Sequence, residues 1–86
     1  MNYLHKEFVC TGGETVRVDL NGQANVKILD DSNFHQYHRG GSHRFHGGLA
    51  KRTPVLLAVP GPGRWHVVVD LGGYRGTVRA SISLLN

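Results

Sequence analysis

The sequence has a single cysteine, Cys10, so it cannot form an internal disulfide. Small secreted domains often need disulfides to compensate for a thin core, and we therefore expect a reducing, cytoplasmic location. The longest purely apolar run, residues 55–59, is about a quarter of the length of a membrane span. No apolar stretch follows a basic start at the N-terminus, which argues against a secretory signal and against a membrane partner.

The chain is also short, and this excludes a two-domain enzyme. Its 86 residues suffice for one compact core, so we expect a single domain over residues 1–86. Twelve glycines are about twice the average share of roughly 7%, which predicts many tight turns.

Acidic residues are scarce in the later part of the sequence. Residues 1–31 contain three Lys or Arg and five Asp or Glu, whereas residues 32–86 contain seven basic residues and Asp70 alone. The net charge of +4 is moderate and does not by itself name a partner. Any surface that attracts anions is therefore expected to come from residues 32–86.

Apolar residues recur with a period of two, which is typical of half-buried β-strands. Val16, Val18 and Leu20 show the pattern clearly, and Asn21-Gly22 after them is a strong hairpin signal. Strands are predicted over residues 3–9, 16–20, 25–30, 53–59, 64–71 and 77–84. In residues 64–71 we expect Trp65 and Val67 to face the core, with His66, Val68 and Asp70 on the opposite face. The apolar Val68 indicates a second contact surface, a ligand groove or a self-association face, although residues that only complete the strand are favoured.

Residues 31–46 break this alternation. Asp31 or Ser32 can cap a short helix over residues 33–39, and Gly40 can end it. Residues 43–46 are read as an edge strand or an ordered loop. The whole pattern predicts an all-β protein: a single antiparallel β-sandwich, for which a jelly-roll-like strand order is one option, with one short helix.

Two segments carry a family resemblance. They are Gly47-Gly48-Leu49-Ala50-Lys51-Arg52 and the later Trp65-His66-Val67 with Val69-Asp70-Leu71. With them the chain resembles, over nearly its whole length, the bacterial family catalogued as domain of unknown function 1883. The resemblance implies a β-sandwich that also occurs fused to TIR domains, and hence a sensing or recognition role. It supplies no catalytic or ligand-binding residues.

Four histidines, His35, His38, His43 and His46, lie within twelve positions and raise the question of a metal site. If residues 43–46 are extended, His43 and His46 point to opposite faces, so the four cannot converge. We therefore favour polar surface histidines over a metal site, and we expect neither a metal nor a cofactor.

Residues 47–53 combine a glycine pair with Lys51 and Arg52, which suits contact with an anion, although the spacing of a Walker loop is missing. Nucleic acid is a less favoured partner, because the chain has seven aromatic residues, no RNP-like motif and a modest charge. No nucleophile with a base and no pair of distinct carboxylates is recognisable, so an enzyme is not predicted.

The sequence thus favours a cytoplasmic recognition domain that binds a small polar or anionic ligand. The predicted site joins the short helix to the glycine segment and contains Asn33, Tyr37, His43, Arg44, Lys51 and Arg52. Arg44 would clamp the anion, His43 would donate or accept a hydrogen bond, and Tyr37 would stack. The alternative is a protein–protein adaptor or self-associating domain that buries Phe34, Tyr37 and Phe45 against a partner. The sequence does not decide the oligomeric state.

Overall fold

A computed structural model describes residues 3–85, which form seven β-strands and one α-helix. In chain order they are β1 (Tyr3–Cys10), β2 (Thr15–Leu20), β3 (Ala24–Leu29), α1 (Asp31–His38), β4 (His46–Ala50), β5 (Val55–Ala58), β6 (Gly63–Asp70) and β7 (Ala80–Leu85). At eight residues, α1 is too short to cross a bilayer, and no other helix occurs in this range.

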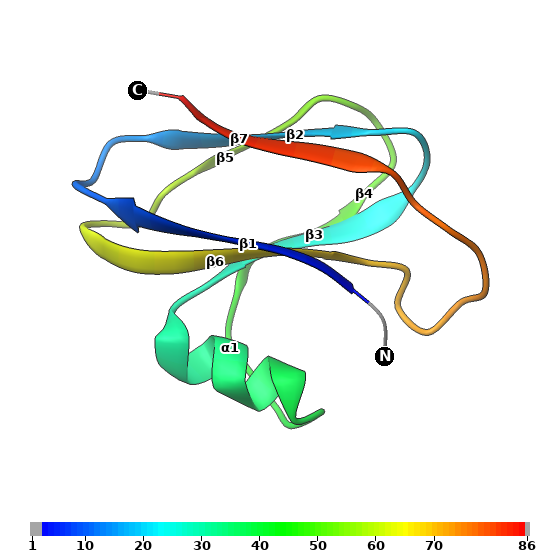
Figure 1. Cartoon of the computed structure of the whole chain (residues 1–86), viewed down its shortest axis with the longest axis horizontal. Helices are drawn as coiled ribbons and strands as arrows, with labels where there is room; N and C mark the ends of the chain where they lie inside the picture. The colour runs from blue at the N-terminus through cyan, green and yellow to red at the C-terminus, as the bar shows by residue number, and fades with distance from the viewer. Residues whose placement is uncertain (1–2, 86) are drawn as a thin grey trace.

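The strands form two antiparallel sheets that lie face to face (Figure 1). Sheet A has the strand order β1-β6-β3-β4, and sheet B has the order β5-β2-β7. The predicted all-β antiparallel sandwich with one short helix is confirmed. In sheet A the register places Glu7 of β1 opposite His66 of β6, which sets the positions of several side chains discussed below.

The main core lies between the two sheets. Val16 and Val18 of β2 face Val26 of β3 and the pair Val67 and Val69 of β6, and all five side chains are buried. Their alternation along each strand puts every second side chain into the same layer. The core faces predicted for residues 16–20 and 64–71 are therefore confirmed.

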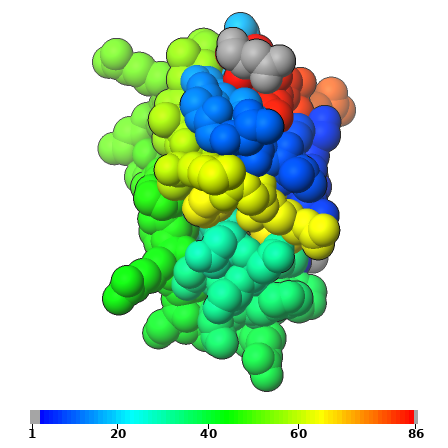
Figure 2. Space-filling model, turned by 90° about the vertical axis from the view of Figure 1, so that its left-hand side faces the viewer, coloured from blue at the N-terminus to red at the C-terminus, as the bar shows by residue number. Residues whose placement is uncertain are grey.

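Helix α1 covers the outer face of sheet A, on the side away from sheet B (Figure 1). Asp30 caps it by accepting a hydrogen bond from the Asn33 backbone N–H at 2.8 Å. The predicted caps, Asp31 and Ser32, are therefore wrong, because they lie one and two residues after the observed cap. Gly40 follows the helix with a φ of 80°, as a glycine stop requires. Figure 2 shows the helix, in teal, directly below the yellow residues near the start of β6.

The helix buries a second, smaller cluster and corrects our interpretation of β6. Leu29, Tyr37 and Val68 form this cluster, with Phe34 packed against it. Because α1 lies on this face, His66 and Asp70 are also buried, with 5% and 2% of their surface exposed. They are internal polar groups with specific partners, and not residues of a plain solvent-facing strand.

The glycine segment is also different from the expectation. Gly47 and Gly48 belong to β4 and pair with Lys27 and Val26 of β3, so they do not form a flexible anion-binding turn. Gly47 has a φ of 111°, and a Cβ atom there would lie 2.2 Å from the Val26 carbonyl oxygen. The position therefore requires glycine for close strand pairing.

Candidate functional site

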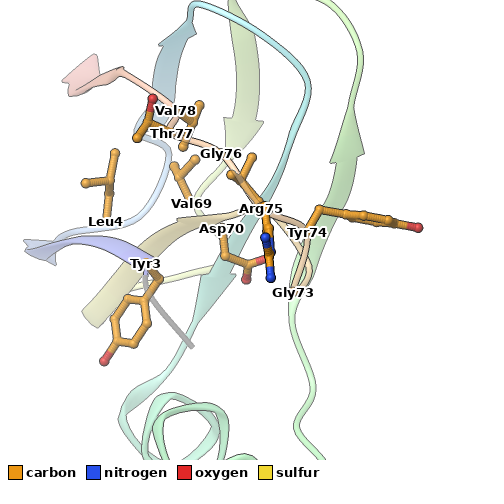
Figure 3. A pocket seen from close by; sticks show the side chains of 11 residues that line it. Tyr3, Leu4, Val69, Asp70, Gly73, Tyr74, Arg75, Gly76, Thr77 and Val78 are labelled. Atoms are coloured by element: carbon orange, nitrogen blue, oxygen red, sulfur yellow. The ribbon is translucent and has the colours of Figure 1, made fainter.

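The described residues line several hollows, three of which are compared below. The first, of about 520 Å³, opens at one end of the sandwich beside the connection between β6 and β7 (Figure 3). Leu4, Val69 and Val78 make much of its lining apolar, while Tyr74 points away and is 84% exposed. Arg75 and the buried Asp70 are the charged residues of this lining.

The second hollow, which we call the helix hollow, has a volume of about 660 Å³. It lies where the end of β3, the start of α1, the segment leading into β4 and the beginning of β6 meet. Its lining combines aromatic, cationic and polar side chains: Ile28, Leu29, Asp30, Asn33, His43, Arg44, Phe45, His46 and Trp65. Three of the six predicted site residues therefore share one hollow.

Asn33 ties the helix to the loop that carries Arg44. Its Oδ1 accepts a hydrogen bond from the Arg44 backbone N–H at 2.7 Å, and its Nδ2 donates to Asp30 Oδ1 at 3.0 Å. Both polar atoms of the amide are thus used inside the protein. Asn33 thus fixes the backbone at Arg44, an exposed residue that lines the hollow.

His43 is likewise occupied by internal contacts. Its Nδ1 lies 2.9 Å from the Gly41 carbonyl oxygen and must donate, because a carbonyl can only accept. Its Nε2 then accepts from Lys27 Nζ at 3.3 Å. The Lys27 ammonium also lies 4.5 Å from the centre of the Phe45 ring. This cation–π contact helps to fix the segment between α1 and β4 against β3.

Tyr37 does not have the predicted stacking role. It is 2% exposed, and its hydroxyl donates to Asp70 Oδ2 at 2.6 Å. Burial of the Asp70 carboxyl opposes its ionisation, but hydrogen bonds from Tyr37, Asn25 and Gly72 outweigh this and lower its pKa. Burial, together with the carboxylate of Asp70, raises the pKa of Tyr37.

Lys51 and Arg52 lie outside the helix hollow. They line a third hollow, of about 570 Å³, between the edge strands β4 and β5. The five residues of β4 separate them from Arg44, and an extended strand of this length spans roughly 17 Å. The structure therefore does not bring the six predicted residues into one face.

His46 and Trp65 are two of the six lining residues of the helix hollow that were not predicted as ligand contacts. His46 is the first residue of β4, and its ring stands edge-on to Trp65, with 6.3 Å between the ring centres. Trp65 Nε1 donates to the Gly61 carbonyl oxygen at 2.8 Å, which fixes the orientation of the indole. Since Trp65 alternates with core residues, the sequence contained no signal that one side of its ring borders a hollow.

The four clustered histidines do not converge. His38 Nδ1 is 2.6 Å from the Tyr3 hydroxyl, His43 contacts Gly41, and His46 faces Trp65. A different group brings potential metal ligands together within residues 3–85. His5, Glu7 and His66, from the neighbouring strands β1 and β6, have ligand atoms within 4.8 Å of one another.

The comparison with family models decides the kinship of the chain. The model of the domain of unknown function (DUF1883) matches residues 1–86. The chain belongs to the DUF1883 family. No curated protein matches this DUF1883 chain, and no solved structure matches it either.

Membership confirms the resemblance seen in the sequence, but the description of the DUF1883 family assigns no activity. Both segments that carried the resemblance lie in sheet A: residues 47–50 form most of β4, and residues 65–70 most of β6. Candidate functions of this DUF1883 domain therefore depend on the geometry described above.

Proposed function

We propose that this domain is a recognition module that binds a small anionic ligand in the helix hollow. The supporting observation is the state of Arg44. Among residues 3–85 no carboxylate oxygen lies within 4.0 Å of its guanidinium, although its backbone is held firmly by Asn33. An exposed guanidinium on a fixed backbone can clamp a carboxylate or phosphate through two parallel hydrogen bonds.

The walls of the hollow favour an anion that also has a flat or apolar part. Phe45 is 41% exposed, and Trp65 presents a ring beside the His46 imidazole. Aromatic side chains of this kind supply contact area with little loss of conformational freedom. A nucleoside monophosphate or an aromatic carboxylate combines both properties, so we expect these classes to bind better than inorganic phosphate.

Asp30 opposes an anion but also offers a sharp test. Its carboxylate lines the hollow and caps α1. Asparagine caps helices about as well as aspartate, so Asp30→Asn removes the charge and keeps the helix. With the repulsion removed, anion affinity should rise about two- to fivefold, the effect of a partly screened charge of roughly 0.5–1 kcal/mol.

The experiment is an NMR titration of the isotope-labelled chain with AMP and, separately, with inorganic phosphate. AMP should shift the amide signals of residues 44–46 and the indole signal of Trp65. Arg44→Ala should weaken binding about tenfold to a hundredfold, since hydrogen bonds to charged groups contribute roughly 1.5–3 kcal/mol. Arg52→Ala is the matched control, because Arg52 is exposed but lines the other hollow.

Equal losses of AMP affinity in Arg44→Ala and Arg52→Ala would mean that binding depends only on general charge attraction. This result would refute the proposed site. The adaptor alternative would rest mainly on Phe45, which is 41% exposed, because Tyr37 is buried and Phe34 is half-buried against it. An absence of anion binding combined with concentration-dependent sedimentation would favour it.

The cellular setting belongs to the same proposal. We expect a bacterial cytoplasmic protein, in keeping with the free and buried Cys10, which a reducing compartment preserves. A recognition module of this kind would suit the fusion to TIR domains that the family resemblance implies. The domain would then supply ligand binding and its neighbour the response.

A further inference from the structure

We propose that His5, Glu7 and His66 form a binding site for a divalent transition metal, and that Zn²⁺ fits it best. The site does not depend on the proposed anion hollow, because the two sets of lining residues have no member in common. It lies on the outer face of sheet A, next to Asp31 at the N-terminal end of α1.

The register of sheet A brings the three side chains together. His5 and Glu7 are two residues apart in β1, so they point to the same face, and His66 of β6 is paired directly with Glu7. His5 Nε2 lies 2.9 Å from His66 Nδ1, and Glu7 Oε1 lies 3.9 Å from the same nitrogen. Two ligands on a tetrahedral Zn²⁺ are about 3.3 Å apart, so small side-chain movements suffice.

Asp31 orients His66 for this role. Its carboxylate accepts a hydrogen bond from His66 Nε2, with 2.5 Å between the two atoms. An ionised carboxylate only accepts, so the proton of the neutral ring is on Nε2 and the lone pair of Nδ1 points toward His5 and Glu7. Metal-ligating histidines regularly donate their second nitrogen to a carboxylate in this way, which makes Asp31 a positioning residue.

Phe34 completes one wall of the site. Its ring stacks on both imidazoles, with 4.3 Å between ring centres and interplanar angles of 16° to His5 and 3° to His66. The helix thus holds both rings in place from one side. His5 and Glu7 are exposed on the other side, which leaves room for a water molecule as the fourth ligand.

The chemistry of the ligand set selects the class of metal. Two imidazoles and one carboxylate suit Zn²⁺ and similar transition metals, whereas Mg²⁺ and Ca²⁺ prefer oxygen ligands alone. Arg64 weakens the site to some degree, because its Nε lies 3.5 Å from the second oxygen of Glu7. Arg64→Gln should therefore leave Zn²⁺ binding intact or strengthen it about two- to fivefold.

The test is a competition titration of the metal-free full chain with Zn²⁺ against a chromophoric chelator. We expect one Zn²⁺ per chain, at micromolar affinity or tighter. His5→Gln and Glu7→Gln should each weaken binding more than tenfold. Both residues are exposed, so these variants should fold, and the fluorescence of Trp65 checks this. The control is His35→Gln, which changes an exposed histidine of α1 outside the site.

Asp31 provides a readout that a purely structural role would not produce. Asp31→Ala should weaken Zn²⁺ binding about tenfold to a hundredfold, and Asp31→Asn, which can still accept the hydrogen bond, should restore part of the loss. Co²⁺ should give the intense visible absorption of a four-coordinate site, and His5→Gln should abolish it. Absent Zn²⁺ binding, or an equal loss in His35→Gln and His5→Gln, would overturn the proposal.

Discussion

Removing the Tyr37 hydroxyl should destabilise the domain strongly without disturbing its packing. Tyr37→Phe keeps the buried ring and deletes the donor that lies 2.6 Å from Asp70 Oδ2. The other two donors to this carboxylate, Asn25 Nδ2 and the Gly72 N–H, both bind Oδ1. Within the described part of the chain, the variant therefore leaves Oδ2 of a buried carboxylate without a hydrogen bond.

The magnitude follows from that arrangement. A hydrogen bond to a charged group contributes roughly 1.5–3 kcal/mol, and an unsatisfied buried charge falls in the upper part of this range. We expect the free energy of unfolding to fall by about 2–3 kcal/mol at pH 7. For a domain of this size the loss corresponds to roughly 8–24 °C in Tm. Urea unfolding followed by Trp65 fluorescence measures it, with an unchanged m-value.

The dependence on pH identifies Asp70 as the partner. The folded-state pKa of Asp70 is lowered, so its stabilising contribution is complete above the unfolded-state pKa and is lost as the pH falls through the folded-state value. Tyr37→Phe raises the folded-state pKa, so the variant should unfold at a higher pH than the parent. Tyr74→Phe, at an 84% exposed tyrosine, should change neither property. A loss below about 0.5 kcal/mol, or one that is independent of pH, would refute the reasoning.

Three further variants test other parts of the fold. Gly47→Ala should cost at least about 2 kcal/mol, because its Cβ would collide with the Val26 carbonyl at a positive φ, and urea unfolding would detect this. Val67→Ala should cost about 1.5–3 kcal/mol through the cavity left in the core, whereas Val9→Ala, at a 75% exposed position, should cost almost nothing. Backbone hydrogen bonds, above all from Thr11, lower the pKa of Glu14, so Glu14→Gln should remove part of the stability that the parent loses on acidification; identical acid-unfolding curves for both proteins would contradict this.

The strands could be predicted wherever only one face is buried. In β2, Val16 and Val18 are buried while Arg17 is exposed, because no element among residues 3–85 covers the outer face of sheet B. The alternation of apolar and polar residues in the sequence then matches the alternation of buried and exposed side chains. In β6 the last five residues are all buried, since α1 covers the outer face. The single local signal was Val68, an apolar residue between His66 and Asp70.

The candidate site could be predicted only in part, because the role of each side chain depends on contacts with residues that are distant in sequence. Arg44 lines the helix hollow together with Asn33 and His43, but the side chains of Asn33 and His43 make hydrogen bonds within the chain. Similarly, the partner of His66 in β1 is 61 residues away, and its carboxylate partner Asp31 is 35 residues away. The four histidines that are close in sequence do not converge, whereas strand register brings His5 and His66 together.

In topological terms the whole segment from Asp30 to Phe45 is the loop of one hairpin, since β3 and β4 are antiparallel neighbours with Ile28 opposite His46. This loop contributes Arg44 to one proposed site and Asp31 and Phe34 to the other. Exchanging it between family members should therefore change anion binding and the affinity for Zn²⁺, while the three metal ligands stay in β1 and β6. Tyr37 is the part such a graft has to keep, because it seals the outer face of sheet A.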